Sequence, residues 1–501
     1  MAELNRNACP PGDYQVVVIG SGPGGLQAGY SLAQAGVRTA IVSADDGPGG
    51  MFRRFPLFQR LITWTKLHAP AERGTRPYEW YDWNSLIGED RGLRSLVPEF
   101  MDGTSYFPSR PEMERGLTEF HDRAKVEVRY GCQWGSTRKD GEKFVVTTSD
   151  GEYRCDALIV AVGMTEPWKP NNIPGIENAP HYVETKPINE HAGKRVLVIG
   201  KRNSGFEIAD ALLPWARQII LASPRPARIS VLVHSTAAAR ARYLQPYEDH
   251  VLGGGNIVLD AATERLDRMP NGRWRAQLKG TTRPGDFALE VDEVIAATGF
   301  GTPLRDLPAL GVKTFYQGRL PAQTAYWESA SVPGIYFAGS ITQGSIGLKK
   351  YGIPSNSAAV HGFRYNAVVL ARHIAETRFG VKFEAAECTP RSVVRYLLSE
   401  ATHAPELWNQ QSYLARVLNF DSNGAIADQG IQPLAHFVDA GGSDGVAMAM
   451  ETDAEGDIHP AVYIRRGGRV EEHTLASSPL LEYETAEHSA QLSSLLKSLI
   501  G

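Results

Sequence analysis

The chain has few cysteines, and no two of them have the spacing of a redox-active dithiol. Its four cysteines are scattered over 501 residues, with no C-x-x-C or C-x-x-x-x-C pair among them: Cys9, Cys132, Cys155 and Cys388. A mechanism that passes electrons through a protein dithiol is therefore not expected. The scattered cysteines are instead typical of the reducing cytoplasm, which is the expected compartment.

The sequence also lacks a membrane-spanning run, a signal-peptide core and an excess of charge. No apolar stretch reaches the length of a transmembrane helix, and residues 1–13 are polar. The formal net charge of −4 gives no sign of a nucleic-acid or membrane-binding surface. The composition is that of a soluble globular protein, and the length is sufficient for more than one domain.

Two glycine-rich loops are present, each between an apolar strand and a helical stretch. The first follows the run 14–19 and the second the run 195–199; they contain Gly20, Gly22, Pro23, Gly24 and Gly25, and Gly200, Arg202, Asn203, Ser204 and Gly205. In such a loop the first glycine forms a tight turn, the second admits a pyrophosphate, and the third allows close helix–strand packing. The first loop, with a helix expected over 26–35 and a strand over 37–42, predicts a dinucleotide site. A turn that serves packing alone is the alternative.

Both loops are followed by the same ending, which indicates two related modules. Hairpin-like stretches precede two strands, each led by an Asp and ended by a Gly, at 156–163 and 292–299. A third strand that ends in Gly follows at 334–340, so the first module is expected to resume there. The predicted fold class is α/β, with two Rossmann-like dinucleotide-binding domains. Their expected extents are 14–166 with 300–378, an inserted domain at 167–299, and a small C-terminal α+β extension at 379–501 of unknown role.

The end of the second strand carries a hydroxyl where a carboxylate for the ribose is expected. Ser43 stands there, next to Ala44. A hydroxyl hydrogen-bonds a ribose more weakly than a carboxylate does, so the adenosine end of the site departs from the usual pattern. Gly50 and Met51 follow at the spacing at which the pyrophosphate and ribityl chain of a flavin pass over the backbone.

Arg202 occupies the middle position of the second loop, where a side chain normally obstructs the pyrophosphate. Two outcomes are open: Arg202 swings aside and pairs with nucleotide phosphates, or it closes the site. Arg225 and Arg228 follow the expected strand 218–222 at the place of a 2′-phosphate. They favour the first outcome and NADP over NAD. A solvated turn is the alternative for these arginines.

Several short strings are similar to those of one flavoprotein family. They are the segments 60–66, 81–87 (which contains Asp82-Trp83-Asn84-Ser85-Leu86), 106–108, 203–207 and 361–365. Together they resemble the FAD-dependent oxidoreductases that include the endoplasmic-reticulum flavoprotein of protein degradation, a branch near the class B flavin monooxygenases. The resemblance spans residues 14–375 and implies FAD in the first domain and NADPH in the second. The chain is similar to a soluble microbial relative of that family.

The resemblance also implies roles for single residues. Thr65 stands where the monooxygenases place an Asn beside the flavin, and Lys66 follows it; both are the candidate catalytic residues. Ser340 follows Gly339 where disulfide reductases carry Asp, which again favours the monooxygenases. The remaining candidates are Trp134 and Gly163 for FAD, and Thr298 and Gly299, with the second loop and Arg225, for NADPH.

Other side chains are less specific. The aromatic residues Trp64, Trp80, Tyr81 and Trp83 are expected either to cover the isoalloxazine ring or to form aromatic core. His68, His234 and His361 stand alone, without metal-ligand spacing, so no metal site is expected.

The favoured hypothesis is an NADPH-dependent flavin monooxygenase of small metabolites. It would form a flavin hydroperoxide with O₂ and oxygenate a soft nucleophile, an amine nitrogen or a sulfur. One alternative is an NADPH oxidase or reductase that passes electrons to a quinone or a partner protein. Another is a non-catalytic FAD-binding interaction protein in which Arg202 closes the second site. Specificity is expected from residues 231–253 and from the tail, and a homodimer is left open.

Overall fold

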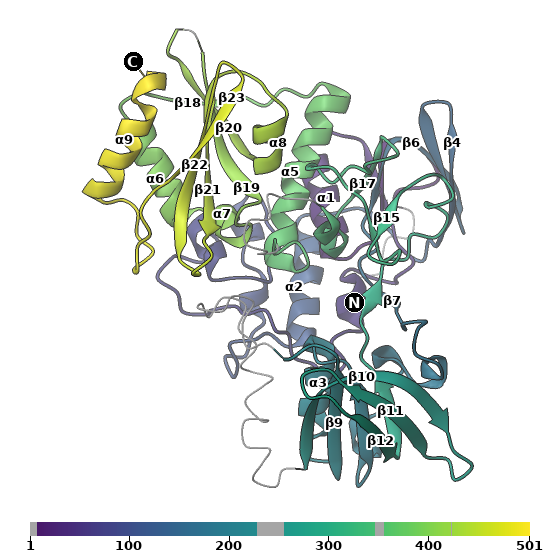
Figure 1. Cartoon of the computed structure of the whole chain (residues 1–501). Coiled ribbons are helices and arrows are strands. Elements are labelled where there is room, and N and C mark those ends of the chain that lie inside the picture. Colours follow the sequence, from purple (N-terminus) through teal and green to yellow (C-terminus); the bar gives the residue numbers. More distant parts are fainter. Residues whose placement is uncertain (1–7, 228–254, 346–354, 422, 501) are drawn as a thin grey trace. The chain divides into compact units, whose positions relative to one another are not determined.

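The structure is a computed structural model that describes residues 8–227, 255–345, 355–421 and 423–500. The chain forms two compact units, Met1–Met164 with Thr302–Gly501, and Thr165–Gly301 (Figure 1). Within these described ranges no helix is both long enough and apolar enough to cross a bilayer.

The first unit contains a seven-stranded mixed sheet, in which β3, β2, β1, β6 and β17 are parallel and β5 and β4 are added by antiparallel pairing. The strand order is β3-β2-β1-β6-β5-β4, and β17 pairs with β6. The strands are β1 (Gly12–Ile19), β2 (Thr39–Val42), β3 (Val128–Arg129), β4 (Trp134–Asp140), β5 (Lys143–Thr148), β6 (Gly151–Val160) and β17 (Ile335–Phe337). Strand β1 is apolar over Val16–Val18 because both faces of the sheet are covered.

Alternate residues of β1 point into two separate cores. Val16 and Val18 pack with α1 and α5, whereas Val17 and Ile19 pack on the opposite face with Trp134. Figure 1 shows α1 and α5 side by side. Outside the C-terminal extension, the α-helices of this unit are α1 (Pro23–Gln34), α2 (Arg110–Arg123) and α5 (Val360–Phe379). The short helices are η1 (Gly50–Arg53), η2 (Arg76–Trp80), η3 (Arg91–Leu93), η4 (Val97–Glu99) and η10 (Gly339–Gly344). A small two-stranded ribbon consists of β15 (Thr314–Phe315) and β16 (Leu320–Pro321).

The second unit contains a six-stranded sheet of order β12-β11-β10-β9-β8-β13. Its strands are β8 (Arg195–Ile199), β9 (Gln218–Ser223), β10 (Asn256–Arg268), β11 (Trp274–Gly280), β12 (Asp286–Val291) and β13 (Glu293–Ala296). The helices are α3 (Asn203–Leu212), η5 (Ile176–Asn178), η6 (Tyr182–Glu184) and η7 (Ile188–His191). The short strands β7 (Glu166–Pro167) and β14 (Phe300–Gly301) pair with each other. The parallel arrangement of β9, β8 and β13 repeats that of β2, β1 and β6 in the first unit.

The two sheets differ at the repeated ending, which the sequence makes look alike. In the first unit the hairpin strand and the buried parallel strand are one element, β6. In the second unit the chain breaks at Asp292, so β12 pairs with β11 and β13 pairs with β8. The Asp292 carboxylate accepts a hydrogen bond from the Arg195 N–H at 2.8 Å, and the Asp292 N–H donates to the Arg195 carbonyl at 2.9 Å. These bonds hold the end of β13 against β8.

The C-terminal extension is an antiparallel sheet with helices on both faces. The strand order is β18-β20-β19-β21-β22-β23. Along β21, Met448 and Met450 pack with α6 and α9, while Ala447 and Ala449 pack with α8. The elements are β18 (Ala386–Cys388), α6 (Val393–His403), α7 (Pro405–Asn409), β19 (Leu414–Phe420), β20 (Ile426–Pro433), α8 (Leu434–Asp439), β21 (Gly445–Thr452), β22 (Ile458–Arg466), β23 (Arg469–Thr474) and α9 (Ala486–Ile500). The predicted α/β fold class with an α+β extension is confirmed.

Candidate functional site

The outer glycines of the first loop are required by the protein's own packing. Gly20 has φ +110°, and a Cβ added there would lie 2.6 Å from the Ala161 carbonyl oxygen. A Cβ on Gly25 would lie 1.9 Å from the Gly20 carbonyl oxygen. Both distances are far below van der Waals contact, so the β1–α1 turn tolerates only glycine at these positions.

Gly22, in contrast, is not required by packing. Its φ of −70° and ψ of 176° are accessible to any residue. The nearest atom to a Cβ added there is the Gly50 Cα at 3.9 Å. Gly22 is also the N-cap of α1, where no side chain caps the helix and no acidic residue lies in the first turn. The free N–H groups of α1 are therefore available to an anion.

Four glycines of the first unit, Gly22, Gly24, Gly50 and Gly339, form a surface of bare backbone that we call the glycine cradle. A Cβ on Gly24 would lie 2.3 Å from the Gly339 Cα, and a Cβ on Gly50 would lie 2.8 Å from the Gly22 Cα. The cradle brings together the starts of α1, η1 and η10. These four glycines carry no side chains beside the N-terminus of α1, and such a glycine-rich helix start is the kind of site that binds a pyrophosphate.

Polar groups at the carboxyl edge of the first sheet border the cradle. Ser43 is buried; its hydroxyl accepts hydrogen bonds from the Ser21 hydroxyl at 2.8 Å and the Asp45 N–H at 3.2 Å. The Ser340 hydroxyl accepts a hydrogen bond from the Met164 N–H at 3.3 Å, which places Ser340 beside the segment that follows β6 and contains Gly163.

The other predicted FAD residues contribute less through their side chains. Trp134 is buried and its indole N–H donates to the Thr137 hydroxyl at 3.0 Å, so this side chain belongs to the core. Ala44 is exposed and Met51 is half-buried. For these three residues a role in binding stays a prediction.

Thr65 lies in a closed hydrogen-bond network. Its buried hydroxyl donates to the Asp82 carboxylate at 2.9 Å and accepts from the Asn84 side-chain amide at 2.9 Å. The hydroxyl proton is thus committed to Asp82. Lys66 is exposed, with its ammonium nitrogen 5.9 Å from the centre of the Tyr81 ring. The catalytic roles of Thr65 and Lys66 stay predictions.

A row of stacked rings leads from the surface to α5. Tyr106, 47% exposed, lies 5.0 Å from Trp64, Trp64 lies 4.5 Å from Trp83, and Trp83 lies 4.2 Å from His361, between ring centroids. Trp80 does not join the row and contacts Trp408 instead, at 4.5 Å. Sequence reasoning treated His361 as a lone histidine, because nothing in the spacing shows its contact with Trp83.

Three buried polar atoms near this row have no partner in the described part of the chain. They are Oδ2 of Asp82, Nδ1 of His361 and Nε of Arg364. The Arg364 guanidinium otherwise donates to the backbone carbonyls of Ser85 at 2.6 Å and Glu79 at 3.0 Å. Buried polar atoms are normally paired, so these atoms indicate a place for water or a polar ligand.

The second loop repeats the geometry of the first. Gly200 has φ +125°, and a Cβ there would lie 2.3 Å from the Ala297 carbonyl oxygen; a Cβ on Gly205 would lie 2.1 Å from the Gly200 carbonyl oxygen. Arg202 is the N-cap of α3 with an extended backbone, φ −112° and ψ −166°, and its side chain is exposed. Packing thus tolerates Arg202 just as it would tolerate a side chain at Gly22. Asn203 and Ser204 are the first residues of α3.

The remaining predicted NADPH residues are partly engaged. The Thr298 hydroxyl donates to the Trp168 carbonyl at 2.5 Å, and the Gly299 carbonyl accepts from Nε2 of His181 at 2.9 Å. Burial lowers the pKa of His181. Arg225 is exposed just after β9. Arg228 and the predicted specificity segment 231–253 lie outside the described residues.

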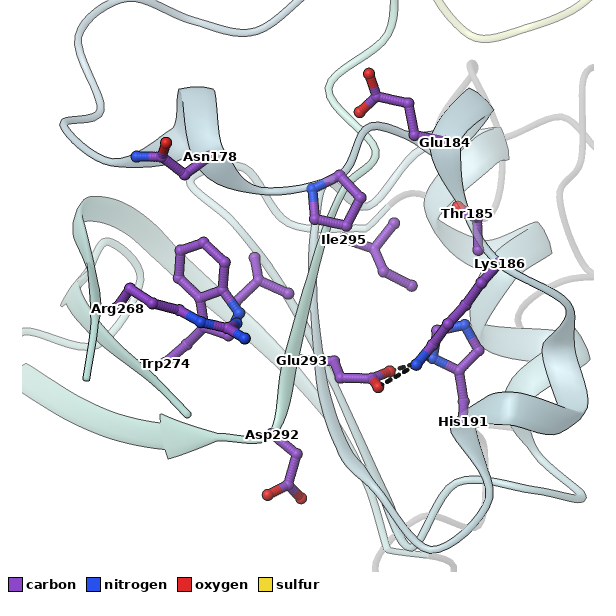
Figure 2. Close-up of a pocket in the computed structure, with 12 residues that line it drawn as sticks. Asn178, Glu184, Thr185, Lys186, His191, Arg268, Trp274, Asp292, Glu293 and Ile295 are labelled. Atoms are coloured by element: carbon purple, nitrogen blue, oxygen red, sulfur yellow. Dashed lines mark hydrogen bonds and ion pairs between the residues drawn. The ribbon is translucent and has the colours of Figure 1, made fainter. Parts of the chain in front are cut away.

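A cavity of about 690 Å³ in the second unit lies along the edge strand β13 (Figure 2). Inside it the Glu293 carboxylate accepts from the Lys186 ammonium at 2.5 Å and contacts the His191 ring. Arg268 and Trp274 form the opposite wall, with the guanidinium 4.8 Å from the indole centre. None of the predicted NADPH residues lines this cavity.

The cysteines are not arranged as a redox centre. Cys9, Cys132 and Cys155 are buried free thiols, and Cys388 is half-buried in the extension. Burial raises the pKa of the three buried thiols, that of Cys155 to about 12. These thiols therefore stay protonated and unreactive near neutral pH.

Comparisons with known proteins show the family and the fold. A family model described as pyridine nucleotide-disulphide oxidoreductase matches residues 17–339. The Mus musculus protein named FAD-dependent oxidoreductase domain-containing protein 2 is 27% identical over 457 residues, which cover 83% of this chain and 65% of the mouse protein. The chain thus spans less than two thirds of that relative's length.

Two further matches cover less of this chain. The ferredoxin–NADP reductase of Thermus thermophilus is 26% identical over 65% of this chain and 84% of its own length. Among solved structures, a flavin-containing monooxygenase from Stenotrophomonas maltophilia matches with a TM-score of 0.52 and 22% identity, over 72% of this chain and 98% of its own. That match shows the fold.

The stacked histidine predicts a pH dependence of stability. Burial, with the nearby Arg364 charge second, lowers the pKa of His361 from 6.5 to about 3. Because the pKa of His361 is lower in the folded state than in the unfolded state, the stability that neutral His361 provides is fully present above about pH 6.5. Below that pH the free energy of unfolding falls by about 1.4 kcal/mol per pH unit. In urea unfolding of the apoprotein, we expect the His361→Phe variant to gain about 2 kcal/mol relative to wild type between about pH 6.5 and about pH 5. An unchanged difference would show that His361 titrates normally.

Two neighbouring glycine substitutions separate packing from ligand binding. We expect Gly25→Ala to destabilise the first unit by about 1–3 kcal/mol, because its Cβ meets backbone at 1.9 Å. We expect Gly22→Ala to change stability by less than about 0.5 kcal/mol, yet to weaken FAD binding at least about tenfold. Urea unfolding and fluorescence titration with FAD measure the two effects. Normal FAD affinity in Gly22→Ala would mean that the cradle does not hold the cofactor.

Proposed function

Because the chain belongs to the pyridine nucleotide-disulphide oxidoreductase family, we propose that it is an FAD-dependent monooxygenase that uses NADPH. The proposed reaction transfers one atom of O₂ to a soft nucleophile of a small metabolite, an amine nitrogen or a sulfur. The other oxygen atom leaves as water, and NADPH supplies the two electrons. When bound, FAD supplies this two-electron and oxygen chemistry, and the protein supplies binding and orientation.

The glycine cradle is the observation that carries the FAD assignment. Gly22 is free of side-chain atoms without any packing reason, and the α1 N-terminus beside it has no capping side chain. A ligand explains both features together, since a pyrophosphate needs the space and accepts hydrogen bonds from the free N–H groups. The name of the mouse relative supports FAD as that ligand.

Two exposed arginines of the second unit support NADPH. The Arg202 side chain begins at the N-terminus of α3, where nucleotide phosphates bind in this type of fold. Arg225 follows β9, where this type of fold binds the ribose of a dinucleotide, and it is proposed to meet the 2′-phosphate. Neither arginine is buried in the core, so both are free to turn towards phosphate oxygens, which suit the guanidinium fork. The name of the Thermus relative supports NADP.

The cysteine arrangement favours an acceptor outside the protein. The described cysteines form no pair, and the three buried thiols have raised pKa values. Electrons that enter with NADPH therefore have no protein dithiol to reduce. Oxygen is the proposed acceptor, and Ser340 in place of an Asp beside Gly339 supports a monooxygenase over a disulfide reductase.

A reductase is the second candidate function. The match to a ferredoxin–NADP reductase over 84% of that protein's length favours it. Such an enzyme would bind the same two cofactors but pass its electrons to a partner protein or a quinone. The two functions differ only in the acceptor, so the acceptor is what must be measured.

Isotopically labelled O₂ distinguishes the two functions. We expect the protein, reduced by NADPH without air and then exposed to labelled O₂ with amines and thioethers, to place one labelled atom in a product detected by mass spectrometry. The control is the same mixture without NADPH. Reduction of a quinone or ferredoxin with no labelled product would replace the monooxygenase by the reductase. Tight FAD binding with no NADPH oxidation at all would favour a non-catalytic FAD-binding interaction protein.

Arg202 decides whether the second site is open. If its guanidinium pairs with phosphates, we expect Arg202→Gly to raise the KM for NADPH at least about tenfold, because a charge-assisted hydrogen bond contributes roughly 1.5–3 kcal/mol. Arg275→Gln, which removes an exposed charge from β11, is the control and should leave the KM unchanged. A lower KM or higher turnover in Arg202→Gly would instead mean that the arginine obstructs the site.

A further inference from the structure

Gln410 of the C-terminal extension makes three side-chain hydrogen bonds to the rest of the first unit, two of them buried. It follows α7 and is fully buried. Its side-chain oxygen accepts from the Asn356 N–H at 3.0 Å, and its amide nitrogen donates to the Ser357 hydroxyl at 3.0 Å and to the Asn366 side-chain oxygen at 2.6 Å. An amide that uses both of its ends in this way fixes the orientation of all its partners.

These hydrogen bonds continue to the glycine cradle. The Asn366 side-chain amide donates to the Thr342 hydroxyl at 3.1 Å, and that hydroxyl donates to the Gly339 carbonyl at 2.7 Å. Asn366 and Thr342 are each 1% exposed, so water does not compete for these bonds. Gly339 is the cradle residue that lies against Gly24. A single chain of side chains therefore connects Gln410 to the backbone on which the cofactor is proposed to lie.

The extension also holds the segment that leads to Asp82. The Arg76 guanidinium at the start of η2 forms hydrogen-bonded ion pairs with Glu400 and Glu406, both at 2.8 Å. Trp80 at the end of η2 contacts Trp408 at 4.5 Å between ring centroids. The extension thus contacts both the η10–α5 region and the segment before the Asp82–Thr65 network.

We propose that the C-terminal extension is part of the flavin site, and that Gln410 is the positioning residue through which it acts on the glycine cradle. This inference rests on the proposed binding of FAD in the first unit. Gln410 does not touch the cofactor in this account. It sets the position of Gly339 through Asn366 and Thr342, and with it the spacing between the starts of η10 and α1.

The neighbouring Gln411 provides a matched control. Its side-chain oxygen accepts from the Thr452 hydroxyl at 2.7 Å, which keeps this glutamine within the extension itself. Gln410→Ala and Gln411→Ala thus remove the same side chain from adjacent positions. Gln410→Glu is the third variant: it keeps the size of the side chain but replaces the amide donor by an oxygen that faces Asn366 Oδ1.

The test is FAD affinity together with the midpoint potential and absorption spectrum of the bound flavin, for the full-length wild type and the three variants. We expect Gln410→Ala and Gln410→Glu to weaken FAD binding about tenfold and to shift the flavin potential, with native far-ultraviolet circular dichroism. Gln411→Ala should match wild type in all three measurements.

Wild-type affinity, potential and spectrum in both Gln410 variants would overturn the inference while leaving the proposed function standing. Equal losses in Gln410→Ala and Gln411→Ala, or loss of folding in both Gln410 variants, would also overturn it, since Gln410 would then act on stability alone. A wild-type protein that binds no FAD would contradict the proposed function itself.

Discussion

The close approach of bare backbone at the glycine cradle is the constraint on which the first unit depends. Gly24 and Gly339 belong to segments more than 300 residues apart, yet a Cβ on Gly24 would lie 2.3 Å from the Gly339 Cα. This contact brings the start of α1 to the start of η10. The sheet and its two cores support that meeting point, and a pyrophosphate is the kind of group that uses the N–H donors left free there.

Much of the fold can be predicted from the sequence, because the apolar runs and glycines at the two loops lie at the strand–turn–helix units that form both sheets. The α/β fold class, the strands at 14–19 and 195–199 and a helix after each loop are read directly from apolar runs and glycines. The continuity of β6 from Gly151 to Val160 is not visible in the sequence, since a short apolar run reads alike whether or not it continues a hairpin strand. Helix starts are also displaced: α1 begins at Pro23 rather than at residue 26.

The candidate site is less predictable than the fold, because its contacts join distant segments. Thr65 is found from its sequence context, but its commitment to Asp82 and Asn84 depends on how two loops pack. His361 stands alone in the sequence, and only the structure shows that its ring stacks on Trp83. Gln410 carries no motif at all. In both loops packing requires the outer glycines but leaves the middle position open, and there the two loops differ: Gly22 in the first and Arg202 in the second.

The account's central claim is that the first unit binds FAD on the glycine cradle. The most direct measurement is the identity and amount of flavin released when the purified full-length protein is denatured, by chromatography against FAD and FMN standards. We expect FAD, close to one molecule per chain after reconstitution. Release of FMN, or no flavin after incubation with excess FAD, would contradict it.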